Sequence, residues 1–146
     1  MSITDPLTSH RLLLYYKGNI SALTLFAQHG NGSVCFPDAL PVLSEILDEH
    51  TEASKVSLHP SVLVSAVNQR LKLDNDLLRV EAGFNEQIDC PGGIITVHMA
   101  RFTLLDPPHK LMQQRECRMR TLPELRNRPY TEIELLRRAY VKVMEG

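Results

Sequence analysis

The chain contains no tryptophan and few other aromatic side chains. Its 146 residues include four Tyr and four Phe, so aromatic residues make up 5% of the sequence, whereas hydrophobic residues make up 43%. The core must therefore be built from aliphatic side chains. A chain of this length buries about two-thirds of its unfolded surface. We therefore expect one domain over residues 1–146.

Cysteine pairs and long apolar runs are also missing. Cys35, Cys90 and Cys117 are far apart, and no Cys-x-x-Cys pair occurs, which excludes a disulfide framework and a structural zinc site. The apolar stretch 12–16 is shorter than a signal-peptide core, and no run approaches the roughly 20 residues of a membrane helix. We expect a cytoplasmic protein that does not enter a membrane.

Two catalytic motifs are absent, and the charges are unevenly distributed. Without Gly-x-Ser-x-Gly or a glycine–lysine phosphate loop, the serine-hydrolase elbow and the P-loop are excluded.

Residues 1–100 carry six Lys/Arg against eleven Asp/Glu, and residues 101–146 carry ten against six. The basic side chains of residues 110–128 have only Tyr130 nearby for base stacking, which disfavours nucleic acid. The excess of positive charge in residues 101–146 fits either a surface for an anionic partner or a solvated helix face.

The first half of the chain mixes strand and helix patterns. Branched and aromatic residues at 12–16 and 20–27, separated by Lys17-Gly18-Asn19, predict a hairpin, and a short strand is expected at 34–36. In 38–49, apolar residues recur at helical spacing, which predicts a helix. A polar loop is expected at 50–58. Pro60 then opens a second helix, expected over 60–73, with Val67 and Leu71 buried.

The second half contains the strongest hairpin signal. Residues 77–88 and 94–105 flank Cys90-Pro91-Gly92-Gly93, and the second run is apolar on both faces, as in a central strand covered by helices. A helical turn at 109–114 and a half-exposed strand at 115–121 follow.

The C-terminal segment carries clear helix signals. Thr131 and Glu134 have the spacing of a capping box, and Glu134 precedes Arg138 by four residues, as in a helical ion pair. The inward stripe is expected to comprise Ile133, Leu136, Tyr140 and Val143, with Tyr140 as anchor. Together these elements predict an α+β fold with a mixed β-sheet flanked by helices.

Two segments carry a resemblance to a known family. They are VLVSAVNQRLKLD at 62–74 and RTLPELRNRPYTEIELLRRAY at 120–140, and their aliphatic pattern over 60–146 resembles the second half of the Nudix hydrolase fold. The resemblance implies an α/β/α sandwich. It also implies a helix whose carboxylates, in that family, hold the divalent ions that activate water.

The family's acidic residues are absent at the matching positions. Its Arg-Glu pair falls on Ser65 and Ala66, and its paired glutamates fall on Gln69 and Arg70. The upstream glycine and glutamate fall on Thr51 and Ser57. Magnesium requires oxygen ligands, and an arginine repels it. We therefore expect no catalytic residue of the Nudix type, no metal site and no cofactor.

Three residues are candidates for ligand binding: Glu86, His98 and Arg101, a cluster able to bind an anion beside the predicted hairpin. They also fit an ordinary polar sheet surface. The leading hypothesis is a non-catalytic binding or interaction module for an anionic or nucleotide-like ligand or a protein partner, with a homodimer left open. The alternative is a divergent hydrolase of a phosphate-containing small molecule, with groups drawn from Glu86, Asp89, His98 and Glu116.

Overall fold

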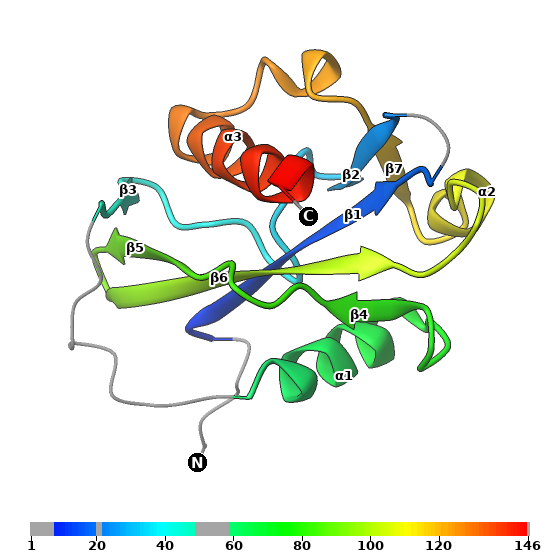
Figure 1. The fold of residues 1–146 in the computed structure, drawn as a ribbon. Helices are drawn as coiled ribbons and strands as arrows, with labels where there is room; N and C mark the ends of the chain where they lie inside the picture. Colours follow the sequence, from blue (N-terminus) through cyan, green and yellow to red (C-terminus); the bar gives the residue numbers. More distant parts are fainter. Residues whose placement is uncertain (1–7, 20–21, 49–58, 146) are drawn as a thin grey trace.

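Seven strands form one mixed sheet with helices on both of its faces (Figure 1). The computed structural model describes residues 8–19, 22–48 and 59–145. In chain order the elements are β1 (His10–Lys17), β2 (Thr24–His29), β3 (Glu45–Ile46), α1 (Pro60–Leu71), β4 (Leu78–Val80), β5 (Glu86–Cys90), β6 (Gly93–Phe102), α2 (His109–Gln113), β7 (Cys117–Arg120), the 3-10 helix η1 (Pro123–Leu125) and α3 (Tyr130–Glu145). The predicted α+β class with a mixed, helix-flanked sheet is confirmed.

Strand β6 lies at the centre of this sheet, as its apolar pattern predicted. The strand order is β3-β5-β6-β1-β2-β7, and β4 pairs with β6 beyond the end of β5. On its other side β6 runs parallel to β1, in a register from His10↔Thr96 to Tyr15↔Arg101. Strands that are apolar on both faces need cover on each side. Figure 1 shows α3 on one face and α1 on the other.

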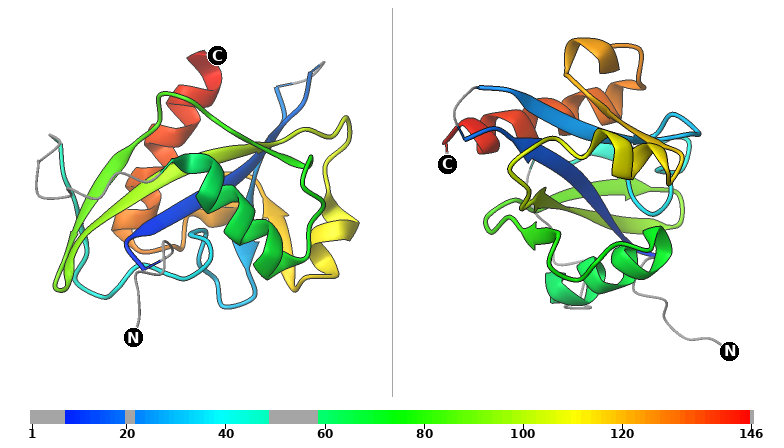
Figure 2. Two further views of the ribbon diagram at one scale, coloured as in Figure 1. Left: turned by 90° about the horizontal axis from the view of Figure 1, so that it is seen from below. Right: turned by 90° about the vertical axis from the view of Figure 1, so that its right-hand side faces the viewer.

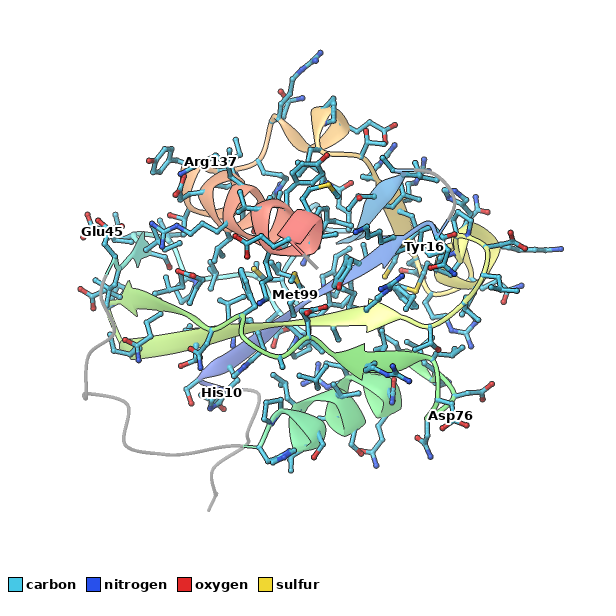
Figure 3. All side chains as sticks on the ribbon, in the orientation of Figure 1. His10, Tyr16, Glu45, Asp76, Met99 and Arg137 are labelled. Carbon is cyan, nitrogen blue, oxygen red and sulfur yellow. The ribbon has the colours of Figure 1, made fainter. Side chains whose placement is uncertain are left out.

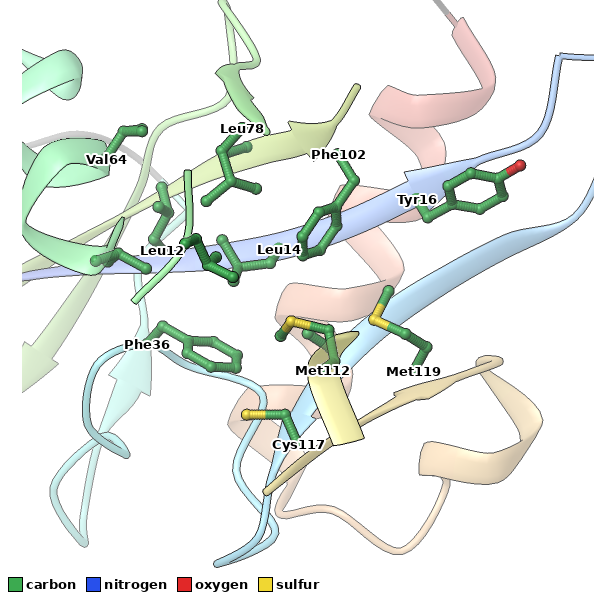
Figure 4. Close-up of a cluster of buried hydrophobic side chains, with 14 of the residues drawn as sticks. Leu12, Leu14, Tyr16, Phe36, Val64, Leu78, Phe102, Met112, Cys117 and Met119 are labelled. Carbon is green, nitrogen blue, oxygen red and sulfur yellow. The ribbon is translucent and has the colours of Figure 1, made fainter. Parts of the chain in front are cut away.

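Alternate side chains of β1 and β6 divide the core into two clusters. Leu12, Leu14 and Phe102 pack with Leu63 and other residues of α1 on one face; Figure 4 shows part of this cluster. The opposite face has its own buried side chains, packed under α3: Leu13, Tyr15, Val97, Met99, Leu135, Leu136, Ala139 and Val143. The two views in Figure 2 show the two helices on opposite sides of the sheet.

Helix α1 begins at Pro60, as predicted, and ends two residues earlier than expected. The Nδ1 atom of His59 accepts a hydrogen bond from the backbone N–H of Ser61 at 3.1 Å, which caps the helix start. Lys72 ends the helix in the left-handed conformation, with φ 55°. Val67 is fully buried, as expected, but Leu71 is only half-buried.

The helix predicted over 38–49 is wrong. Leu43 has a φ of 68°, which a helix does not allow, and Glu45–Ile46 form the edge strand β3 against β5. Leu40 and Ile46 pack partly on the α3-side core, whereas Val42 and Leu43 are 83% and 82% exposed. The helical spacing of the apolar residues did not determine the structure here. The unpaired backbone at the edge of β5 forms hydrogen bonds with an extended segment instead.

The capping box predicted at Thr131 is also wrong. Helix α3 already begins at Tyr130, and the Thr131 hydroxyl donates to the carbonyl oxygen of Ser44 at 2.8 Å. The ion pair between Glu134 and Arg138 is confirmed, with 2.9 Å between Oε2 and Nε. Leu136 and Val143 are buried as expected, but Ile133 and Tyr140 are half-buried, so Tyr140 is not the anchor.

The remaining expectations have mixed outcomes. The β1–β2 and β5–β6 hairpins, α2 and the half-exposed β7 are confirmed. The expected strand at 34–36 is a single bridge between Leu12 and Phe36, and the run 77–88 is split into β4 and β5. The predicted loop 50–58 lies outside the described residues. No helix in the described part of the chain is long and apolar enough to span a membrane.

Leu63 and Val62 offer a matched test of how α1 packs. Leu63 is fully buried and Val62 is 46% exposed. We expect Leu63→Ala to lower the free energy of unfolding by about 2–5 kcal/mol, because it leaves a cavity under the helix. Val62→Ala should change it by less than about 0.5 kcal/mol. Urea denaturation measures both values, and equal effects would show that the helix register is wrong.

Candidate functional site

A row of polar side chains crosses three strands on the face covered by α3. Arg101 of β6 lies opposite Tyr15 of β1 on one side and opposite Arg79 of β4 on the other. Residues in register point to the same face of a sheet, and Tyr15 belongs to the α3-side cluster. Two arginines therefore face each other directly across a strand pair, an arrangement that destabilises a sheet unless another group compensates it.

This row forms the floor of a cleft of about 470 Å³. The cleft lies at the carboxyl ends of β1 and β6, where the C-terminal part of α3 reaches the sheet. The Nζ atom of Lys17 donates to the carbonyl oxygen of Val143 at 3.1 Å, which joins β1 to that helix. The charged and polar lining residues are Tyr15, Lys17, Asn19, Arg79, Glu81, Arg101, Thr103 and Lys142.

Among its described lining residues, the cleft has four cationic side chains, those of Lys17, Arg79, Arg101 and Lys142, and one carboxylate, that of Glu81. Within the part of the chain that the structure describes, none of the four forms an ion pair with a carboxylate. Arg101 instead donates from Nη2 to the carbonyl oxygen of Lys17 and to Oδ1 of Asn19, both at 3.2 Å. These contacts hold its guanidinium in place without neutralising it.

Glu81 and Tyr15 form a hydrogen-bonded pair in the cleft. The Tyr15 hydroxyl donates to Oε1 of Glu81. Burial, followed by the hydrogen bond to this carboxylate, raises the pKa of Tyr15 far above its ordinary value. The phenol is thus a permanent donor. The backbone N–H of Glu81 also donates to the carbonyl oxygen of Met99 at 2.8 Å, which fixes the residue beside β6.

Of the three predicted ligand-binding residues, only Arg101 lies in this cleft. Glu86 is on the same face but is tied to Arg138, with 2.7 Å between Oε1 and Nη1. Arg138 also contacts Glu134 and Asp48, so this charge network is already satisfied. A structural role accounts for the position of Glu86.

His98 lies on the opposite face, because it is in register with Leu12 of the α1-side cluster. It is 6% exposed, and its Nε2 atom lies 3.2 Å from Nδ1 of His10, with the two rings stacked. Figure 3 shows His10 on the side of α1, whereas Met99 lies between β6 and α3. The structure therefore separates His98 from both Glu86 and Arg101.

The residues of the alternative hypothesis are also dispersed. Asp89 is exposed on β5 opposite Glu45 of the edge strand, and Glu116 precedes β7 near the other edge of the sheet. Among the described residues, no group of three or more His, Cys, Asp or Glu side chains could hold a metal ion.

Helix α1 lies on the face of the sheet opposite the cleft. Of the positions that match the family's catalytic residues, Ser65, Gln69 and Arg70 are exposed and Ala66 is half-buried. Thr51 and Ser57 lie outside the described residues. The cleft therefore does not involve the helix on which the Nudix resemblance depends. No family model matches this chain, and neither does any of the curated proteins.

Sequence reasoning missed Tyr15, Lys17, Arg79, Glu81 and Lys142. They are widely spaced in the sequence and share no motif. The sequence carried a signal for two of these residues. Arg79 and Glu81 alternate with apolar residues, which predicts that they share a face of their strand. Which charged residues would meet depended on the parallel pairing of β1 with β6 and on where α3 ends.

The pair of buried histidines predicts an acid-sensitive fold. Burial, followed by the charge of His10, lowers the pKa of His98 to about 4, and burial, followed by Arg11, lowers that of His10. The folded chain then binds fewer protons than the unfolded chain, whose histidines titrate near 6.5. Stability should therefore fall as the pH drops from about 6.5 to 4, with His98 contributing on the order of 3 kcal/mol.

Urea denaturation between pH 7 and 4 measures this loss. His98→Gln should make the decline with falling pH shallower, because the variant has no imidazole to protonate at that position. Exposed His109 provides the control, and His109→Gln should retain the slope of the parent. Parallel pH profiles for the parent and His98→Gln would contradict the prediction.

Proposed function

We propose that the chain is a Nudix-like binding module that holds a small phosphate-bearing anion and lacks the metal-dependent hydrolysis of that family. The observation that carries the proposal is the set of four cations in the cleft, none of them paired with a carboxylate of the described residues. Arginine forks match phosphate oxygens with two parallel hydrogen bonds. An anion between Arg79 and Arg101 would relieve the repulsion across the strand pair.

The place and size of the cleft support the same function. In open α/β sheets, ligands bind beyond the carboxyl ends of parallel strands, and here Lys17 and Arg101 lie at the ends of the parallel β1 and β6. A volume of about 470 Å³ is typical of small-molecule sites. We place this module in the cytoplasm, where its three free cysteines stay reduced.

The first test is the binding of inorganic pyrophosphate, measured by calorimetry at low salt. Arg79 is exposed, so Arg79→Ala should spare the fold and weaken binding about tenfold or more, since a hydrogen bond to a charged group contributes about 1.5–3 kcal/mol. Arg118→Ala is the matched control, because it removes another exposed cation from β7, the strand at the other edge of the sheet. Equal losses in the two variants, or no binding by the parent, would contradict the proposal.

The second test separates a binding module from a divergent hydrolase. Ser65, Ala66, Gln69 and Arg70 supply no carboxylate to hold magnesium, so we expect no magnesium-dependent hydrolysis of nucleoside diphosphate derivatives. Phosphate release is measured with and without a chelator, alongside a calorimetric titration with magnesium. A chelator-sensitive turnover of about 1 per second, an ordinary enzyme rate, would favour the hydrolase instead.

A further inference from the structure

Glu81 is a carboxylate in a cleft that otherwise suits an anion. A negative charge at this position repels phosphate, yet Glu81 forms no ion pair with any cation among the described residues. It is held by the Tyr15 hydroxyl at Oε1 and by its own backbone bond to Met99. A carboxylate that only neutralised the cleft would sit against an arginine or a lysine. The bond to Tyr15 accounts for one carboxylate oxygen and leaves the role of the other, Oε2, to be explained.

An ionised carboxylate only accepts hydrogen bonds, and so it binds ligand groups that donate them. The Tyr15 hydroxyl occupies Oε1, and no described residue donates to Oε2 of Glu81. Oε2 is therefore available to a donor from the ligand. The donor is more favourably a hydroxyl than an ammonium group, because a ligand cation here would face Arg79, Arg101 and Lys142 in the same cleft.

The lining also argues against a nucleobase. Bases in such sites stack on exposed aromatic faces. The two aromatic side chains that line the cleft, Tyr15 and Phe102, are only 2% and 1% exposed, because their rings belong to the two core clusters. Among the described lining residues, then, no ring face is available for stacking. The ligand has to be recognised through charge and hydrogen bonds.

We propose that the cleft binds the phosphate ester of a polyhydroxylated compound, such as a sugar phosphate, with Arg79 and Arg101 at the phosphate and Glu81 at a hydroxyl. This inference rests on the proposed function, since it requires that the cleft bind phosphate. Glu81 then determines specificity, and Tyr15 positions it. The carboxylate weakens the binding of a bare phosphate and strengthens that of a phosphate with a neighbouring hydroxyl.

The test compares two ligands of equal charge by calorimetry on the full chain. Ribose 5-phosphate carries hydroxyls and methyl phosphate carries none, so the unaltered protein should bind ribose 5-phosphate at least about tenfold more tightly. In Glu81→Gln the two affinities should move in opposite directions. Binding of ribose 5-phosphate should weaken, because the charged acceptor is lost. Binding of methyl phosphate should tighten, because a repelling charge is gone.

The outcomes separate this inference from the proposed function. If both ligands bind the parent equally, or if Glu81→Gln weakens both by the same factor, Glu81 has only a structural role and the inference is overturned while anion binding stands. Tighter binding of phosphoethanolamine than of ribose 5-phosphate would also overturn it, in favour of a ligand ammonium. If none of the three ligands binds, the proposed function fails as well. The comparison on the parent needs no variant, so a misfolded Glu81→Gln would not prevent a decision.

Discussion

The parallel pairing of β1 with β6 determines where the other elements pack. Six residue pairs join the two strands, and both strands are apolar on both faces, so they require helices on each side. A shift of one residue would move every side chain of β1 to the opposite face. Leu12 and Leu14 would then leave α1, and Leu13 and Tyr15 would leave α3. Burial on both faces thus enforces one register.

That register also determines the chemistry of the two faces. On the α1 side it stacks His10 against His98, two buried imidazoles whose pKa values are lowered because burial favours the uncharged form. On the α3 side it brings Tyr15 beside Arg101 at the end of the sheet. The same pairing therefore accounts for the acid sensitivity that we expect and for the floor of the cleft.

The α3 face contains two charge clusters with different balances. Near β3 and β5, Arg138 contacts Glu86, Glu134 and Asp48, and Arg137 also pairs with Glu134, so two cations are matched by three carboxylates. At the other end of α3, Glu81 is the only carboxylate among the described residues that line the cleft, and it bonds to Tyr15 rather than to a cation. The first cluster is a closed structural network, whereas the second keeps an excess of positive charge among the described residues. This contrast supports our choice of the cleft as the functional site.

The sequence alone determined the elements that are marked by turn or helix-start residues, or by strands that are apolar on both faces. The β5–β6 hairpin follows from Pro91-Gly92, the central place of β6 from its two apolar faces, and the start of α1 from Pro60. It misled where a local pattern competed with tertiary contacts. Residues 38–49 have helical spacing but join the edge of β5, and Thr131 bonds to Ser44 rather than capping a helix. Only the tertiary structure decided the site, because Tyr15, Arg79, Glu81 and Arg101 meet through strand pairings between distant segments, which no local pattern encodes.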